Sequence, residues 1–155
     1  MKRLLILILL ALPLRVMAQM PTIQELGKEA QKHKGVKHTS INSVMLGMAA
    51  TFAPKEQRAI FKMLKNIDLI ECNNDDYAPQ LTQQALKIAK QAGTKHLGTQ
   101  DDGLARNEVY ALQKGDTIVE LIILSYGHNG SVALTAMSGE IPVDSIEEIS
   151  KIKPQ

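Results

Sequence analysis

The pattern of hydrophobic and polar positions changes near Gly93. Before that residue, apolar side chains recur mainly every three or four positions, which is typical of helices that bury one side. After it, apolar and polar residues alternate, which is typical of half-buried strands. The pattern therefore predicts a first part of helices with two strands and a second part of strands joined by tight turns.

Helix start signals divide the first part of the chain. Thr22 and Glu25 form a capping-box pattern, in which each side chain satisfies a backbone amide near the other, and this predicts an opening helix that ends near Gly35. Three more helices are predicted here: a short one capped at Asn42-Ser43, one with Pro54 in its first turn, and a long one capped within Asn73–Asp76 and stopped by Gly93.

Strand patterns account for most of the remaining chain. The predicted strands are residues 36–41, 66–72, 95–101, 107–113, 117–126 and 132–137. Hairpin turns are predicted at 114–116 and 127–130, because Gly, Asn and Asp accept the positive φ that tight turns require. Residues 118–124 are apolar at nearly every position, so we expect a central strand covered on both sides.

The C-terminal pattern and the absence of linkers complete the fold prediction. Asp144 begins a second capping-box pattern and predicts a final helix, whose buried stripe comprises Val143, Ile146, Ile149 and Ile152. No linker or repeat divides residues 19–155. We predict a single α+β domain with a mainly antiparallel sheet, a C-terminal β-meander and helices packed mostly on one face. Helices on both faces are the alternative.

The first residues have the features of an export signal. A positive start at Lys2 and Arg3 precedes an apolar run, and Val16-Met17-Ala18 suits the peptidase site, so residues 1–18 are predicted to be a cleaved signal peptide. An uncleaved membrane anchor needs about 20 apolar residues, and Pro13 and Arg15 interrupt this run. We therefore expect a periplasmic or secreted protein of Gram-negative-type export without stable membrane insertion.

Composition then limits the partners. The chain has 155 residues, with 18 basic and 16 acidic side chains and a single Cys. Three of the basic residues lie in the predicted signal peptide, so the remainder is nearly neutral and no nucleic-acid partner is expected. One thiol forms no internal disulfide, so aliphatic side chains must build the core.

No pattern of reactive residues matches a known kind of active site. A cysteine nucleophile needs a base, and Cys72 lies in an apolar strand with no histidine beside it, so we expect a packed thiol. The spacing of the four histidines, His33, His38, His96 and His128, matches no zinc template. The polar, Gly-framed segment around His128 is expected to be a hairpin tip.

Two acidic segments resemble parts of cation sites. His96 precedes Asp101 and Asp102, and Asn73–Asp76 resembles part of a calcium loop without its glycine and final glutamate. Solvated turns are the expected role of both, and the basic cluster comprising Lys28, Lys32, Lys34 and Lys37 is expected to be a solvated helix face, because no aromatic residue accompanies it. We thus expect no catalytic, cofactor-binding or metal-binding residue.

Several segments also resemble a known family. These segments are Ile41–Leu46, Asn107–Tyr110, Lys114–Asp116 with Val119–Leu124, Ser138–Ile141 and the helix at Asp144. They are similar to the exported domain-of-unknown-function family numbered 4252, and they are a strand-to-helix passage, a hairpin, a buried strand and a Gly turn. The resemblance implies a small envelope or secreted protein with no assigned activity. Genes of this family often neighbour genes of extracytoplasmic-function sigma factors, and the resemblance therefore implies a role in envelope signalling. Many members carry a lipid-attachment Cys, which this chain lacks.

Three functional classes remain open. The preferred one is a non-catalytic interaction module of the cell envelope with an envelope protein as partner, since the pattern builds a core and gathers no reactive groups. The second is an envelope sensor or regulator that acts with a membrane partner of a sigma-factor system. The third is a metal-assisted hydrolase that uses His96, Asp101 and Asp102. A binding module offers an exposed strand such as 95–101, whereas an enzyme needs a concave pocket.

Overall fold

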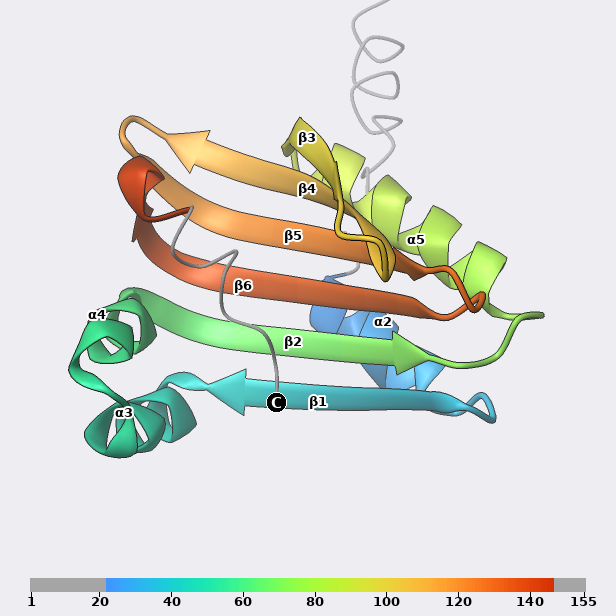
Figure 1. Cartoon of the computed structure of the whole chain (residues 1–155), viewed down its shortest axis with the longest axis horizontal. Coiled ribbons are helices and arrows are strands. Elements are labelled where there is room, and N and C mark those ends of the chain that lie inside the picture. The colour runs from blue at the N-terminus through green and yellow to red at the C-terminus, as the bar shows by residue number, and fades with distance from the viewer. Residues whose placement is uncertain (1–21, 147–155) are drawn as a thin grey trace, which may run out of the picture.

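A six-stranded antiparallel sheet is the centre of the fold (Figure 1). The structure is a computed structural model and describes residues 22–146. Along the chain its elements are α2 (Ile23–Ala30), β1 (Val36–Asn42), α3 (Ser43–Phe52), α4 (Lys55–Met63), β2 (Leu64–Cys72), α5 (Ala78–Gln91), β3 (Lys95–Asp101), β4 (Ala105–Lys114), β5 (Thr117–Gly127), β6 (Val132–Pro142) and a short 3-10 helix (Val143–Ser145). The predicted signal peptide lies outside the described residues.

The strand order places the last four strands together. The order across the sheet is β1-β2-β6-β5-β4-β3, and each neighbouring pair is antiparallel. Strands β3 to β6 therefore form the predicted meander, and β1 and β2 extend the sheet beside β6. The predicted α+β class and the antiparallel sheet with a C-terminal meander are confirmed.

One core lies between the sheet and helices α2 and α5, on what we call the α2/α5 face (Figure 1). Helix α2 contributes Ile23, Leu26 and Ala30, which recur at helical spacing. Helix α5 contributes Leu81, Ala85 and Ile88 together with Ala78 and Ala89. Strands β2, β5 and β6 supply Ile70, Ile122, Leu134 and neighbouring residues, and Tyr77 joins this core from the start of α5.

A second core lies on the opposite face, which we call the α3/α4 face. It comprises Leu46, Ile60, Leu64, Ala111, Ile118, Leu121 and Ile141. Helices α3 and α4 lie together at one end of the sheet (Figure 1). Leu46 of α3 and Ile60 of α4 belong to this core. Alternate residues of β5 enter the two cores, which agrees with the expected strand covered on both sides.

Side-chain caps define several helix ends as expected. The Thr22 hydroxyl accepts from the Glu25 amide and the Glu25 carboxylate accepts from the Thr22 amide, so the predicted capping box is present. The Asn42 carboxamide accepts from the amides of Val44 and Met45 at the start of α3.

Among the helices within residues 22–146, none combines the length and apolar character needed to cross a membrane.

The C-terminal part of the prediction needs correction. Strand β6 continues to Pro142, five residues beyond its predicted end, and Gly139 lies in this strand rather than in a turn. The reason is close packing: a methyl group at Gly139 would overlap the Met63 carbonyl oxygen, so only glycine lets β6 approach the start of β2. Val143, predicted to be buried, is 36% exposed. Ile146 packs against the second core, and Ile149 and Ile152 lie outside the described residues.

This close approach predicts a strong effect of a small substitution. Gly139→Ala is expected to lower the free energy of unfolding by about 1–3 kcal/mol, because the added methyl forces two strands apart. Gly98→Ala is the matched control, since a methyl there meets nothing within 4 Å. Urea denaturation of both variants measures the difference, and equal stabilities would contradict the packing argument.

Candidate functional site

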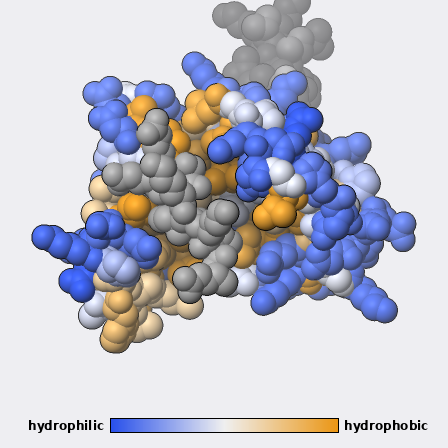
Figure 2. Space-filling view, viewed as in Figure 1, coloured by the Kyte–Doolittle hydropathy of each residue, from blue (hydrophilic) through white to orange (hydrophobic). Residues whose placement is uncertain are grey.

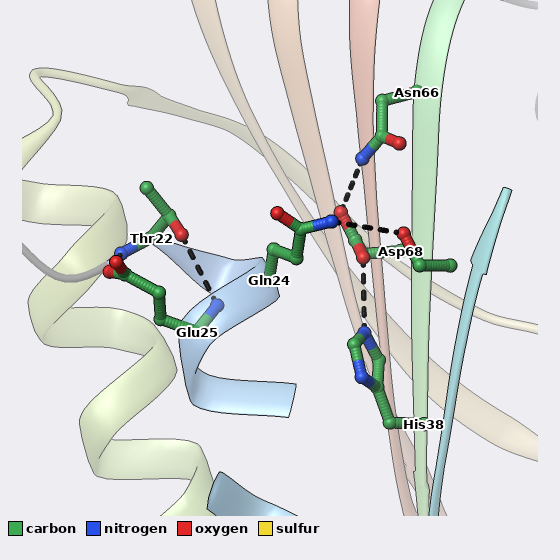
Figure 3. A network of polar contacts seen from close by, with 7 residues as sticks. Thr22, Gln24, Glu25, His38, Asn66 and Asp68 are labelled. Atoms are coloured by element: carbon green, nitrogen blue, oxygen red, sulfur yellow. Dashed lines mark hydrogen bonds and ion pairs between the residues drawn. The ribbon is translucent and has the colours of Figure 1, made fainter. Parts of the chain in front are cut away.

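A buried polar network lies between α2 and the first two strands (Figure 3). The Nε2 atom of His38 is 3.0 Å from Oδ1 of Asp68, and both side chains are only 6% exposed. The Asn66 carboxamide donates a hydrogen bond to the other carboxylate oxygen of Asp68. The antiparallel register opposes Asp68 to Ser40, so His38 reaches the carboxylate diagonally across the two strands.

Helix α2 closes this network. A methyl group at Gly27 would lie 2.5 Å from the Cδ2 atom of His38, so glycine lets the helix rest on the imidazole ring. Gln24 of the same helix donates from Nε2 to the Ser40 hydroxyl of β1 at 3.3 Å (Figure 3). With so little exposure, the His38–Asp68 pair contributes to the docking of α2 and offers no open surface to a ligand.

A shallow groove of about 570 Å³ runs between α2 and α5. The His33 ring stacks on Tyr77 with ring centres 3.8 Å apart and planes 15° apart. The Oε1 atom of Gln84, which lines the groove, is buried and has no hydrogen-bond partner. Glu29 and Lys32 form an exposed ion pair of 2.7 Å at its rim. The groove is polar at its rim and apolar at its base, where Leu26 and Ile88 lie.

A third group of polar residues follows alternate positions of β4. Oε1 of Glu108 accepts from Arg106 and its Oε2 accepts from the Tyr110 hydroxyl, each at 2.9 Å. The Glu108 side chain is 16% exposed. Sequence reasoning did not select these residues, although their two-residue spacing on a predicted strand places them on one face. Both carboxylate oxygens of Glu108 therefore have a hydrogen-bond partner, one in Arg106 and one in Tyr110.

Burial and charge perturb the tyrosines around Glu108. Burial, with the nearby Glu108 carboxylate as a second cause, raises the pKa of Tyr126 from 10.0 to about 12. Burial and the hydrogen bond to Glu108 also raise the pKa of Tyr110. Both hydroxyls therefore stay protonated at neutral pH, which makes them hydrogen-bond donors rather than bases.

The residues of the proposed hydrolase site are divided between two neighbourhoods. His96 contacts the Thr99 hydroxyl and lies against the Tyr110 ring. Asp101 instead faces His128, with 3.6 Å between Oδ1 and Nε2. Asp102 accepts from the amides of Leu104 and Ala105 and so shapes the β3–β4 turn. Within residues 22–146, no three His, Cys, Asp or Glu side chains are placed to hold a metal ion.

The remaining candidates occupy structural positions. Cys72 is buried, and its Sγ lies 3.5 Å from the Asn74 carbonyl oxygen, which confirms the expected packed thiol. Asn74 accepts from two amides ahead of α5, so Asn73–Asp76 is the expected turn, but the N-cap residue of α5 is Tyr77, which makes no side-chain cap hydrogen bond. The segment 127–130 is the predicted hairpin tip, with positive φ at Gly130. The four lysines Lys28, Lys32, Lys34 and Lys37 are exposed as expected, but they do not form a helix face: α2 ends at Ala30, so only Lys28 lies on it, and Lys37 is in β1.

Helix α3 carries the most exposed apolar surface of the described chain. Four of its side chains are open to solvent: Val44 (70% exposed), Met45 (46%), Met48 (59%) and Phe52 (88%). Only Leu46 and Ala50 of this helix are buried. Figure 2 shows the corresponding orange corner of the molecule beside the blue side chains over α4. Met45 and Met48 fall within the predicted short helix that begins at Asn42-Ser43, but the sequence pattern does not show which side of this helix the sheet covers.

The comparisons with known proteins identify a family. A family model described as domain of unknown function (DUF4252) matches residues 29–149. The chain belongs to the DUF4252 family. The DUF4252 match includes all six strands, the His38–Asp68 pair and the whole of α3. Searches of curated proteins and of solved structures found no match.

The buried pair of this DUF4252 chain predicts a large coupling energy. Removing one partner, in His38→Ala or Asp68→Ala, is expected to lower the free energy of unfolding by about 3–5 kcal/mol, because the other polar group stays buried. The double variant is expected to lose much less than the sum. The exposed His128–Asp101 pair is the control. Its double-mutant cycle is expected to give a coupling energy of less than about 1 kcal/mol. Equal coupling energies in the two urea-denaturation cycles would contradict this prediction.

The raised tyrosine pKa predicts a dependence on alkaline pH. The folded state keeps Tyr126 protonated up to about pH 12, whereas the unfolded chain loses that proton near pH 10.0. The unfolded state then binds fewer protons, so the free energy of unfolding falls as pH rises between these values. Tyr126→Phe is expected to reduce this fall and to remove the last step of the tyrosinate absorbance titration. An unchanged last step in the variant would refute the assignment.

Proposed function

We propose that this chain is an exported, non-catalytic binding module of the cell envelope, and that the outward surface of α3 is its contact surface. The single observation that carries the proposal is the exposure of four large apolar side chains on one helix, with Phe52 88% exposed. Exposed apolar patches on a soluble domain mark interaction sites, because keeping them in water is unfavourable. Export is supported by the predicted signal peptide at residues 1–18.

The positions of the apolar residues around α3 support a partner that covers its outward side. Leu46 and Ala50 are four residues apart and bury one side of the helix against the sheet. Val44, Met48 and Phe52 are also four residues apart and lie on the opposite side, with Met45 beside them. A helix that is apolar on two opposite sides is typical of a helix buried on both. Within residues 22–146, the chain covers only the side that carries Leu46 and Ala50.

The edge strand β3 is a weaker candidate surface. It is at the edge of the sheet, as a strand-addition site requires, and most of its side chains are exposed. However, its pairing with β4 is irregular between His96 and Gly98, and Lys95 and Asp101 place charges at its ends. Natural edge strands use such irregularities and charges to discourage pairing. The α3 surface has neither feature.

The two alternative functions differ from this proposal in what they require. A regulator that acts with a membrane partner uses the same α3 surface and differs only in what binds there. A metal-assisted hydrolase requires His96, Asp101 and Asp102 to gather around one ion, and Asp101 faces His128 instead. Calorimetry with zinc, calcium and manganese tests the hydrolase, and tight binding of one of these ions would favour it.

Site-specific photocross-linking in living cells tests the proposal. A photoreactive residue at Met48 is expected to give a reproducible adduct, because this position lies in the exposed stripe. The same residue at Gln83, an exposed position of α5, is the control and is expected to give none. Phe52→Ser should weaken the Met48 adduct about tenfold, since a large apolar contact is lost. Equal adducts at both positions, or none at either, would reject α3 as the contact surface.

Mass spectrometry of the exported chain tests cleavage before Gln19.

A further inference from the structure

We propose that α3 binds an anionic phospholipid surface, lying flat at the interface with its exposed stripe among the acyl chains. This inference rests on the proposed function and names the partner of the same surface. The stripe consists of Val44, Met45, Met48 and Phe52, and it contains no polar side chain. A contact surface of this kind has no hydrogen-bonding pattern with which to recognise a particular protein, whereas it suits a fluid hydrocarbon.

The shape of the surface agrees with this occupant. Residues four apart on a helix form a ridge along its length, and Val44, Met48 and Phe52 are such a row. A ridge needs a matching groove in a folded partner, but fluid acyl chains close around it without one. Helix α3 has ten residues and is therefore about 15 Å long, which is too short to span a bilayer. It fits along the interface instead.

The charges beside α3 select an anionic surface. Helix α3 contains no charged residue, and α4, which follows it directly, exposes Lys55, Arg58 and Lys62 against a single acid, Glu56. Nε of Arg58 donates to the Ala53 carbonyl oxygen at 2.8 Å, which fixes this cation at the end of α3. Cations next to an inserted apolar stripe lie at the level of the lipid phosphates, where each is attracted by the negative surface.

Vesicle binding with a local reporter tests the inference. All variants are purified as the form that the expressing cells export, and all have the same N-terminus. Apolar segments outside α3 then contribute equally to vesicle binding in every sample. An environment-sensitive dye on Thr51→Cys, at the edge of the stripe, is expected to shift to the blue with vesicles of phosphatidylcholine and phosphatidylglycerol. The dye on Gln83→Cys should not shift, and the unsubstituted chain measures labelling of the buried Cys72.

Matched variants test the two parts of the surface. Phe52→Ser is expected to weaken vesicle binding about tenfold, whereas Leu104→Ser, at another highly exposed apolar side chain (76% against 88% for Phe52), should leave it unchanged. The double variant Lys55→Gln/Lys62→Gln is expected to weaken binding by about fivefold per cation on anionic vesicles. The same change at Lys87 and Lys90 of α5 is the control. Pure phosphatidylcholine should bind all of these variants weakly.

The outcomes separate this inference from the function on which it rests. If the dye at Thr51→Cys does not respond to vesicles, or if Phe52→Ser binds as well as the Leu104→Ser control, lipid binding through α3 is overturned. A protein adduct at Met48 in cells would then leave the binding module standing with a protein partner. If the vesicles fail and the Met48 adduct is also absent, both proposals fail.

Discussion

The fold depends on a strand that is apolar on both sides. Ile122 and Leu124 of β5 belong to the core under α2 and α5, whereas Leu121 belongs to the core on the opposite face. Because consecutive side chains of a strand point to opposite faces, this strand requires cover on both. Helices α2 and α5 meet the requirement on one face. On the other, α3 and α4 cover one end of the sheet, and the position of α3 follows from that need.

The buried His38–Asp68 pair sets how α2 meets the sheet. Taking an imidazole and a carboxylate out of water is unfavourable, and mutual contact offsets this only when the geometry is good. Asn66 supplies a further hydrogen bond to the carboxylate, and Gly27 lets the helix backbone approach His38 closely. The hydrogen bonds of the pair join β1 to β2, so they hold the His38 ring in the position against which Gly27 packs. Helix α2 also bonds to β1 directly, through Gln24 and Ser40.

Local signals in the sequence predicted most of the fold, and contacts between distant segments account for what they missed. Caps and turns such as Thr22 and Gly115 depend on a few neighbouring residues, so their positions were correct. Gly139 was misread because its close neighbour Met63 lies far away along the chain. The His38–Asp68 pair depends on the register of β1 against β2, which no local pattern reveals. Likewise, His128 rather than His96 faces Asp101 because the hairpin tip folds back beside the β3–β4 turn.

The ends of α3 explain how an apolar helix remains suited to a water-poor contact. Helix ends leave amides and carbonyls without partners, and these groups oppose transfer out of water. Asn42 accepts from two amides at the start of α3, and Arg58 donates to the Ala53 carbonyl just after its end. Both partners lie outside the helix itself, so the row from Val44 to Phe52 carries no capping side chain. The polar groups that the helix requires are thus placed at its two ends, and its outward side is left free to be apolar.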